Sequence, residues 1–249
     1  MAENEVRATG VVLDLFEHGE SDLIVTLFTR ETGLLSAIAK GAKRSKKRFV
    51  NKLEPFTSLY LHLIPSRKST LYRLDEAEII SSRPEIRFDY RRFSGASLAC
   101  ELLLAWTREA DPALELYELI DWSLDRICSD NMIWALTVYL LRLLKEIGQC
   151  PVLDTCVICG EEKISHHRLS YANHGLVCPR CDRGGEAGST LGAGMIRAMR
   201  ELIAVDLERT SRIGLSRNDR KAILDALINY STWLLQKEPK SWQLVRDFL

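Results

Sequence analysis

Residues 12–49 read VLDLFEHGESDLIVTLFTRETGLLSAIAKGAKRSKKRF. Two segments of this stretch, LIVTLFT and GLLSAIAK, are rich in the aliphatic and β-branched residues that favour strands. The sequence RETG separates them, and Gly33 at its end can adopt the positive φ angle that a tight turn requires. The stretch therefore predicts two strands, joined by a tight turn and followed directly by basic residues.

Three further segments of the N-terminal region have the same composition. They are ATGVVLDLF, FTSLYLHLI and TLYRLDEAEII, at residues 8–16, 56–64 and 70–80. Turn residues separate these segments, so five strands are expected within residues 6–80, which predicts a small barrel. The basic residues fall between the third and fourth strands, where a loop or short helix would project from the barrel.

Residues 40–52, which we call the basic segment, contain seven basic residues and no acidic one, although the whole chain has 34 Lys+Arg and 34 Asp+Glu. Beside a five-stranded barrel, this concentration fits an oligonucleotide-binding (OB) fold, in which a basic groove follows the phosphates and aromatic rings stack on bases. A solvated surface loop is the alternative. The candidate DNA contacts are Lys40, Lys43, Arg44, Lys46, Lys47, Arg48 and Lys52. The candidate stacking residues, for which packing in the core is equally compatible, are Phe49, Phe56, Tyr60 and Tyr72.

Beyond Pro84 the apolar residues follow a helical period, beginning with Leu98, Leu102 and Trp106. Asp111 and Pro112 are suited to be the N-cap and first residue of a second helix, and a third should run from about residue 131 to 147, before Gly148. Two more helices are expected after Gly194. Their apolar faces consist of Met195, Ile196, Met199, Leu202 and Ile203, and of Ile223, Leu224, Leu227, Ser231 and Leu234.

A second group of basic residues lies on these last two helices. Arg197 and Arg200 occupy the polar face of the first, whereas Arg217, Arg220 and Lys221 crowd the first turn of the second. The helix dipole disfavours cations at that end. A bound anion would relieve this cost, and so would solvation, and both explanations stay open. We therefore add Arg197, Arg200, Arg217 and Lys221 to the candidate DNA contacts.

Four cysteines form two CxxC pairs, Cys156 with Cys159 and Cys178 with Cys181, separated by eighteen residues. Two tight turns that each present a pair of thiolates are typical of a site that binds one tetrahedral zinc ion. Four thiolates leave no position for water, so the predicted zinc site is structural and not catalytic. A redox CxxC is the alternative, but it would not require the second pair.

The other cysteines and the nearby histidines receive no metal role. Cys100 and Cys128 fall in helical segments and are expected to be buried, whereas Cys150 stays unassigned. Because four sulfurs already close the site, we expect three histidines to be solvated, namely His166, His167 and His174.

Several classes of protein are disfavoured. The N-terminal sequence has no apolar signal-peptide core, which predicts a cytoplasmic location, and the longest apolar run, residues 133–141, is too short to span a bilayer. The sequence has no P-loop, nucleophile elbow, GxGxxG or HExxH motif, and neither CxxC pair follows the proline expected in a zinc deaminase. No catalytic site is visible, so we expect no enzyme.

These features predict a multidomain α+β protein. Residues 1–80 would form the OB-fold barrel, residues 81–150 and 191–249 a helical bundle, and residues 151–190 an inserted zinc ribbon. This order of parts resembles the bacterial RecO family of recombination mediators. The resemblance covers nearly the whole chain and is most specific at residues 12–49, at LEPF, and at EIGQCPVLDTCVICG.

The resemblance implies a non-enzymatic, nucleoid-associated repair protein that binds single- and double-stranded DNA and anneals complementary strands. It also implies that the protein works with RecR to load RecA onto strands coated by single-strand-binding protein (SSB). The acidic, aromatic-ended SSB tail would need an apolar pocket with a basic rim on the helical domain, for which the candidates are Arg142, Lys145, Arg197 and Arg200. Two alternatives stay open: an RNA- or DNA-binding zinc-ribbon module of transcription or translation, and a nuclease or deaminase that uses the zinc.

Overall fold

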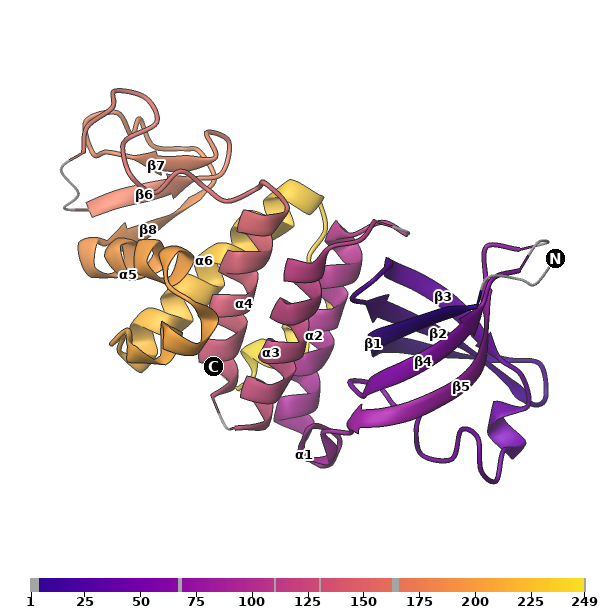
Figure 1. Cartoon of the computed structure of the whole chain (residues 1–249). Coiled ribbons are helices and arrows are strands. Elements are labelled where there is room, and N and C mark those ends of the chain that lie inside the picture. The colour runs from indigo at the N-terminus through magenta and orange to yellow at the C-terminus, as the bar shows by residue number, and fades with distance from the viewer. Residues whose placement is uncertain (1–4, 67–68, 110, 130, 163–165, 249) are drawn as a thin grey trace.

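The computed structural model describes residues 5–66, 69–109, 111–129, 131–162 and 166–248 (Figure 1). It shows a five-stranded barrel at one end, a group of helices in the middle and a three-stranded sheet at the other end. None of the helices in these ranges is long and apolar enough to cross a membrane.

The N-terminal region forms a closed barrel with the strand order β1-β2-β3-β5-β4, as the sequence predicted for an OB-fold. All neighbouring strands are antiparallel except β3 and β5, which pair in parallel through only two residue pairs, Ala37 with Tyr72 and Ile38 with Arg73. The strands are β1 Val6–His18, β2 Asp22–Thr29, β3 Gly33–Ala39, β4 Ser58–Ile64 and β5 Tyr72–Ser81.

The barrel has its own apolar core, made by alternate residues of the strands and closed by the basic segment. Phe49 is buried in this core, together with Leu53. Phe56 is also buried, but it packs with the helices and meets Phe93 edge to face, with 5.3 Å between the ring centroids. Of the four aromatic residues considered for stacking on bases, only Tyr60 is largely exposed, and Tyr72 is half-buried.

The helical part is built around α4, most of whose residues are buried. Helices α2, α3, α5 and α6 surround α4 and share one continuous core with it. The helices are α1 Pro84–Phe88, α2 Tyr90–Trp106, α3 Leu114–Cys128, α4 Met132–Glu146, α5 Ala193–Ala204, α6 Arg217–Leu235 and α7 Lys240–Arg246, with short 3-10 helices η1 Ala42–Arg44 and η2 Leu207–Arg212. The helix predicted between residues 131 and 147 is confirmed as α4, and Gly148 follows it with a φ angle of +71°.

The predicted start of a helix at Asp111 and Pro112 is wrong, because α3 begins at Leu114. The preceding residues lie against the barrel instead. Glu109 forms a parallel bridge with Leu34, and the carbonyl of Asp111 approaches Gly33, where an added Cβ atom would lie 2.1 Å from the oxygen. Gly33 has a φ angle of +70°, and the turn that it forms between β2 and β3 is one of the places at which the barrel meets the helical part.

Arg83 joins the barrel to the helices more firmly. Its side chain is 2% exposed and makes ion pairs with Asp121 and Asp125, at 2.7 Å in both cases. The same guanidinium donates hydrogen bonds to the hydroxyl of Ser58 and to the carbonyl of Phe56. Burial by itself would lower the pKa of Arg83, but the two carboxylates outweigh burial and raise that pKa.

The third part is a small sheet with the order β7-β6-β8, in which β6 is His166–Ser170, β7 Gly175–Val177 and β8 Gly188–Gly192. Leu169 and Leu191 pack into the core of the helical part, and the Tyr171 ring lies 5.9 Å from that of Tyr230. Strand β8 leads directly into α5. The inner face of the sheet is therefore held on the helices both by this connection and by Leu169 and Leu191.

The expectation that the histidines of this region are solvated is wrong for His167, which is 2% exposed. It shares the inner face of β6 with Leu169, because alternate residues of a strand point to the same side. His174 is exposed, but its Nδ1 atom lies 3.1 Å from the hydroxyl of Tyr230. The side chain of His166 lies outside the described part of the structure.

Candidate metal centre and nucleic-acid interface

The four cysteines of the CxxC pairs meet at one point. Their sulfur atoms all lie within 4.8 Å of one another, and the Sγ atoms of Cys159 and Cys178 are 3.7 Å apart. A tetrahedral zinc ion with Zn–S bonds of about 2.3 Å requires sulfur–sulfur distances of about 3.8 Å. The cluster therefore has the size of a four-thiolate metal site.

Backbone hydrogen bonds hold both cysteine turns in place. Gly160 N–H donates to the carbonyl of Cys156 at 2.8 Å, and Cys181 N–H donates to that of Cys178 at 2.9 Å. The N–H group of Cys178 lies 3.3 Å from the sulfur of Cys156. The turns thus direct N–H groups as well as sulfurs at one centre, which stabilises thiolates there.

The pKa values of the thiols are shifted in opposite directions within the cluster. Burial opposes ionisation of Cys156, but N–H groups of Cys178, Cys159 and Ile158 outweigh it and lower the Cys156 pKa to about 6. Hydrogen bonds with the sulfurs of Cys159 and Cys178 raise the pKa of Cys181, since these sulfurs hold its proton. Four crowded sulfurs ionise together only if a cation compensates their charge, so the donor set fits a metal ion.

The basic segment is folded onto the hairpin of β1 and β2. Lys43 Nζ pairs with Glu17 at 2.7 Å, and an Arg44 nitrogen pairs with Glu20 at 3.3 Å. The N–H group of Gly41 donates to the carboxylate of Asp22 at 2.8 Å and thereby helps to lower the pKa of Asp22. These contacts fix the segment on the barrel and partly neutralise two of its predicted DNA contacts.

Two further cations of the segment also have partners, Arg48 within the segment and Lys52 on β5. Arg48 donates to the carbonyl of Lys40 at 2.7 Å and lies over the Phe49 ring, 4.5 Å from its centroid, and Lys52 Nζ donates to the carbonyl of Ala77 at 2.7 Å. Only three of the seven cations have exposed side chains without a hydrogen bond or ion pair to another described residue. They are Lys40, Lys46 and Lys47.

The predicted contacts on the last helices are dispersed. Arg200 is held by the carbonyl of Leu153 at 2.8 Å and by Asp154 at 3.1 Å, so it connects α5 to the segment just before the first cysteine turn. Arg197 is exposed on the same helix, while Arg217 and Lys221 lie at the start of α6. The structure therefore does not bring these four residues together with the basic segment into one continuous group.

A pocket that sequence patterns did not reveal lies where α2, α4 and α6 begin. Its volume is about 290 Å³, and its lining combines the arginines Arg91, Arg217 and Arg220 with apolar Met132, Ile133 and Phe248. Arg220 lies over the ring of Trp134, 4.8 Å from its centroid, which holds this arginine at the rim. The crowding of cations at the start of α6 was the one signal of this pocket in the sequence.

Comparison with known proteins matches nearly the whole chain to one family. A family model described as Recombination protein O N terminal matches residues 1–83, and one described as Recombination protein O C terminal matches residues 87–243. A protein named DNA repair protein RecO from Syntrophobacter fumaroxidans is 30% identical over 244 residues, which are 97% of each chain. Proteins of the same name from Desulfatibacillum aliphaticivorans and Syntrophus aciditrophicus are 32% and 33% identical, over 97% of this chain and 96% and 95% of their own.

Proposed function

The chain belongs to the RecO family of DNA repair proteins, and on that premise we propose that it is a non-enzymatic recombination mediator. It binds single- and double-stranded DNA, anneals complementary strands, and with RecR helps to load RecA onto DNA coated by SSB. It works in the cytoplasm, on the nucleoid. The observation that best supports DNA binding is the group of unpaired lysines, Lys40, Lys46 and Lys47, held on the barrel by the ion pairs of their neighbours.

The buried aromatic residues are consistent with strand annealing. Annealing requires that two phosphate backbones be neutralised so that they approach, while the bases stay free to pair. Phe49 and Phe56 are buried and cannot stack on bases, so lysines supply the contacts near the basic segment. Phosphate contacts hold a strand without reading its sequence, as an annealing protein requires.

Replacement of Lys40, Lys46 and Lys47 by alanine should weaken binding of single-stranded DNA without altering the fold. Each phosphate contact contributes about −0.7 to the slope of log K against log salt, so loss of three should flatten the slope by about 2. Fluorescence anisotropy with a labelled oligonucleotide between about 50 and 200 mM salt measures the slope. Annealing of complementary strands coated with cognate SSB should slow in parallel.

A matched control replaces three exposed cations elsewhere, Arg108, Arg212 and Lys237, by alanine and should keep the slope. If the lysine variant binds with an unchanged slope, the basic segment is a solvated loop and the proposed interface is wrong. If the protein binds RNA of the same sequence as tightly as DNA, and does not anneal complementary strands, the result would instead support an RNA-binding module.

We further propose that zinc is the metal held by Cys156, Cys159, Cys178 and Cys181. All four donors are sulfur, which zinc accepts in closed structural sites. When bound, the ion would supply the cross-link between the two cysteine turns. No substrate position would remain on it, so its role is architectural.

We assign the SSB tail to the arginine-rich pocket at the start of α2, α4 and α6. Of the rim residues expected from sequence, Arg142 bonds to the carbonyl of Val205, Lys145 lies 3.5 Å from that of Ile203, and Arg200 bonds to that of Leu153. The pocket, in contrast, places three arginines around an apolar floor. The acidic residues of such a tail would pair with these arginines, and its terminal aromatic ring would contact the apolar side chains.

Replacement of Arg217 and Arg220 by glutamine should raise the Kd for a labelled SSB tail peptide at least about tenfold, because arginine is enriched among the few interface residues whose loss costs about 2 kcal/mol or more. Fluorescence anisotropy measures this Kd. Arg197→Gln, on the exposed face of α5, is the control and should bind normally. Normal binding by the double variant together with a loss in Arg197→Gln would place the tail on α5 and contradict the assignment.

A further inference from the structure

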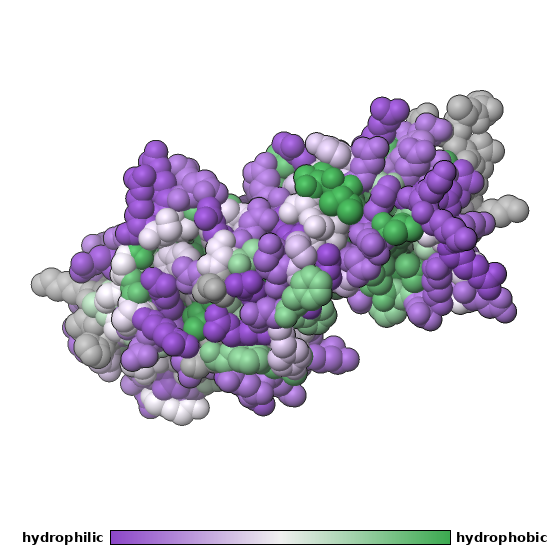
Figure 2. All heavy atoms as spheres, turned by 90° about the horizontal axis from the view of Figure 1, so that it is seen from below, coloured by the Kyte–Doolittle hydropathy of each residue, from purple (hydrophilic) through white to green (hydrophobic). Residues whose placement is uncertain are grey.

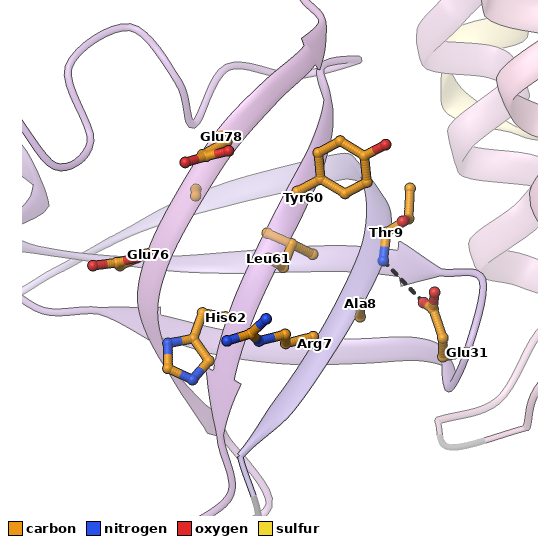
Figure 3. A pocket seen from close by; sticks show the side chains of 10 residues that line it. Arg7, Ala8, Thr9, Glu31, Tyr60, Leu61, His62, Glu76 and Glu78 are labelled. Atoms are coloured by element: carbon orange, nitrogen blue, oxygen red, sulfur yellow. Dashed lines mark hydrogen bonds between the residues drawn. The ribbon is translucent and has the colours of Figure 1, made fainter.

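A groove crosses the outer face of strands β1, β4 and β5 (Figure 3), and the basic segment reaches its edge, where Lys52 Nζ donates to the carbonyl of Ala77 at 2.7 Å. Its volume is about 480 Å³. Ala8, Leu61 and Ala77 form its floor, and two of the three are alanines, whose small side chains point into the barrel core. The walls consist of polar and aromatic side chains that point outward from the same strands.

The strand register arranges these walls in two rows. Tyr60 lies opposite Thr9 on β1 and Glu78 on β5, and His62 lies in the same way between Arg7 and Glu76. Glu31 rises beside the first row, because its carboxylate accepts the N–H of Thr9 at 2.9 Å. Figure 3 shows Glu78 on one side of the Tyr60 ring and Thr9, with Glu31 beyond it, on the other.

The central groups of the groove are available for binding. Tyr60 is 58% exposed, and the side chains of Glu76 and Glu78 are exposed and make no hydrogen bond or ion pair with another described residue. Three carboxylates face one guanidinium and one imidazole. The groove therefore presents an aromatic ring within a surplus of negative charge, which repels DNA phosphates.

The face seen from below has a different character from the groove. In the view from below, hydrophobic residues form separate areas on a mainly hydrophilic surface (Figure 2). Single exposed apolar residues are normal on folded proteins. A partner of the barrel face would thus be selected by charge and by aromatic contact, and not by a large apolar area.

We propose that this groove docks an arginine-bearing segment of a partner protein. A guanidinium over the Tyr60 ring gains a cation–π contact, and its planar set of N–H donors matches the carboxylate of Glu78, the neighbour of Tyr60 on β5. Arginine fits better than lysine, because lysine neither stacks on a ring as a plane nor forms paired hydrogen bonds. The barrel would then bind nucleic acid at the unpaired lysines of the basic segment and a cationic protein segment at the carboxylates of β5.

Amide NMR of the full chain tests this site, with a short blocked peptide of two arginines separated by glycine as the probe. Titration should shift the amides of residues 7–9, 60–62 and 76–78. The same peptide with citrulline in place of arginine has the size but not the charge, and should leave these amides unchanged. The double variant Glu76→Gln/Glu78→Gln should raise the apparent Kd about fivefold or more, because two charge contacts are lost.

The variant Glu146→Gln/Glu201→Gln is the matched control, since it removes two exposed glutamates from helices of the other part of the molecule. It should bind the arginine peptide as the unmodified chain does. The proposal is overturned if the peptide leaves the groove amides unshifted, or if citrulline shifts them equally. It is also overturned if they shift with protein concentration alone, because the occupant would then be a second copy of this chain.

Discussion

Exchange of both Cys156 and Cys178 for serine should abolish metal binding and unfold the two cysteine turns, while the barrel and the helices stay folded. Structural zinc sites contribute about 10–16 kcal/mol of apparent binding free energy in small zinc-binding peptides. Apart from backbone hydrogen bonds the turns have little else to hold them, because the buried members of their own apolar cluster, among the described residues, are only Cys156, Val177 and Cys178. Elemental analysis should find about one zinc per chain in the unmodified protein and almost none in the variant.

Hydrogen exchange should locate the damage. Amides of residues 154–162 and 178–186 should lose protection, whereas β6 and β8 should keep most of theirs, since Leu169 and Leu191 pack into the helical core. Cys150→Ser is the control, because Cys150 lies outside the sulfur cluster. Full zinc content in the double serine variant would contradict a site made by these cysteines.

Arg83→Met should destabilise the protein by about 2–4 kcal/mol, because the buried carbonyl of Phe56 and hydroxyl of Ser58 lose their donor, at about 1–3 kcal/mol for each group left unsatisfied. Methionine has a similar length but replaces none of the bonds to Asp121, Asp125, Ser58 and the carbonyl of Phe56. Arg83→Lys should recover only part of the loss, because one ammonium group cannot reach acceptors on four residues. Urea denaturation at neutral pH measures the free energy of unfolding.

Asp125→Asn gives the comparison within the same network. The Asp125 side chain is 59% exposed, so its loss should lower stability by less than about 1 kcal/mol. The two parts of the chain should also unfold separately in Arg83→Met, and barrel and helical signals would then show different midpoints. A single transition at the normal midpoint would mean that Arg83 does not couple the barrel to the helices.

Local patterns were sufficient to predict the barrel, the main helices and the cysteine cluster. Alternating apolar residues mark each strand, a helical period marks α4 and α6, and CxxC spacing by itself brings sulfurs into range of one ion. Each of these patterns involves residues that are close together in the sequence. The predicted charge cluster was likewise found on one loop, but the sequence did not show that Lys43 and Arg44 pair with glutamates of β1 and its turn.

The features that were missed depend on contacts between distant segments. Asp111 and Pro112 have the composition of a helix start, but Gly33 and Leu34 hold that segment against the barrel. Arg83 looks like any surface arginine until α3 places two aspartates beside it. The arginine-rich pocket assembles from three helix starts far apart in the chain. No local pattern encodes such arrangements, because only the packed fold brings the residues together.

The short parallel seam between β3 and β5 has a consequence for how the barrel assembles. Strands β1, β2 and β3 are joined by tight turns and can pair early, whereas the seam waits until the chain has crossed the basic segment and β4. Closing such a long loop carries an entropy penalty, and the two residue pairs of the seam offset it only after the other strands have paired. Substitutions at Ile38 or Tyr72 that weaken the seam should therefore accelerate unfolding and leave the folding rate almost unchanged.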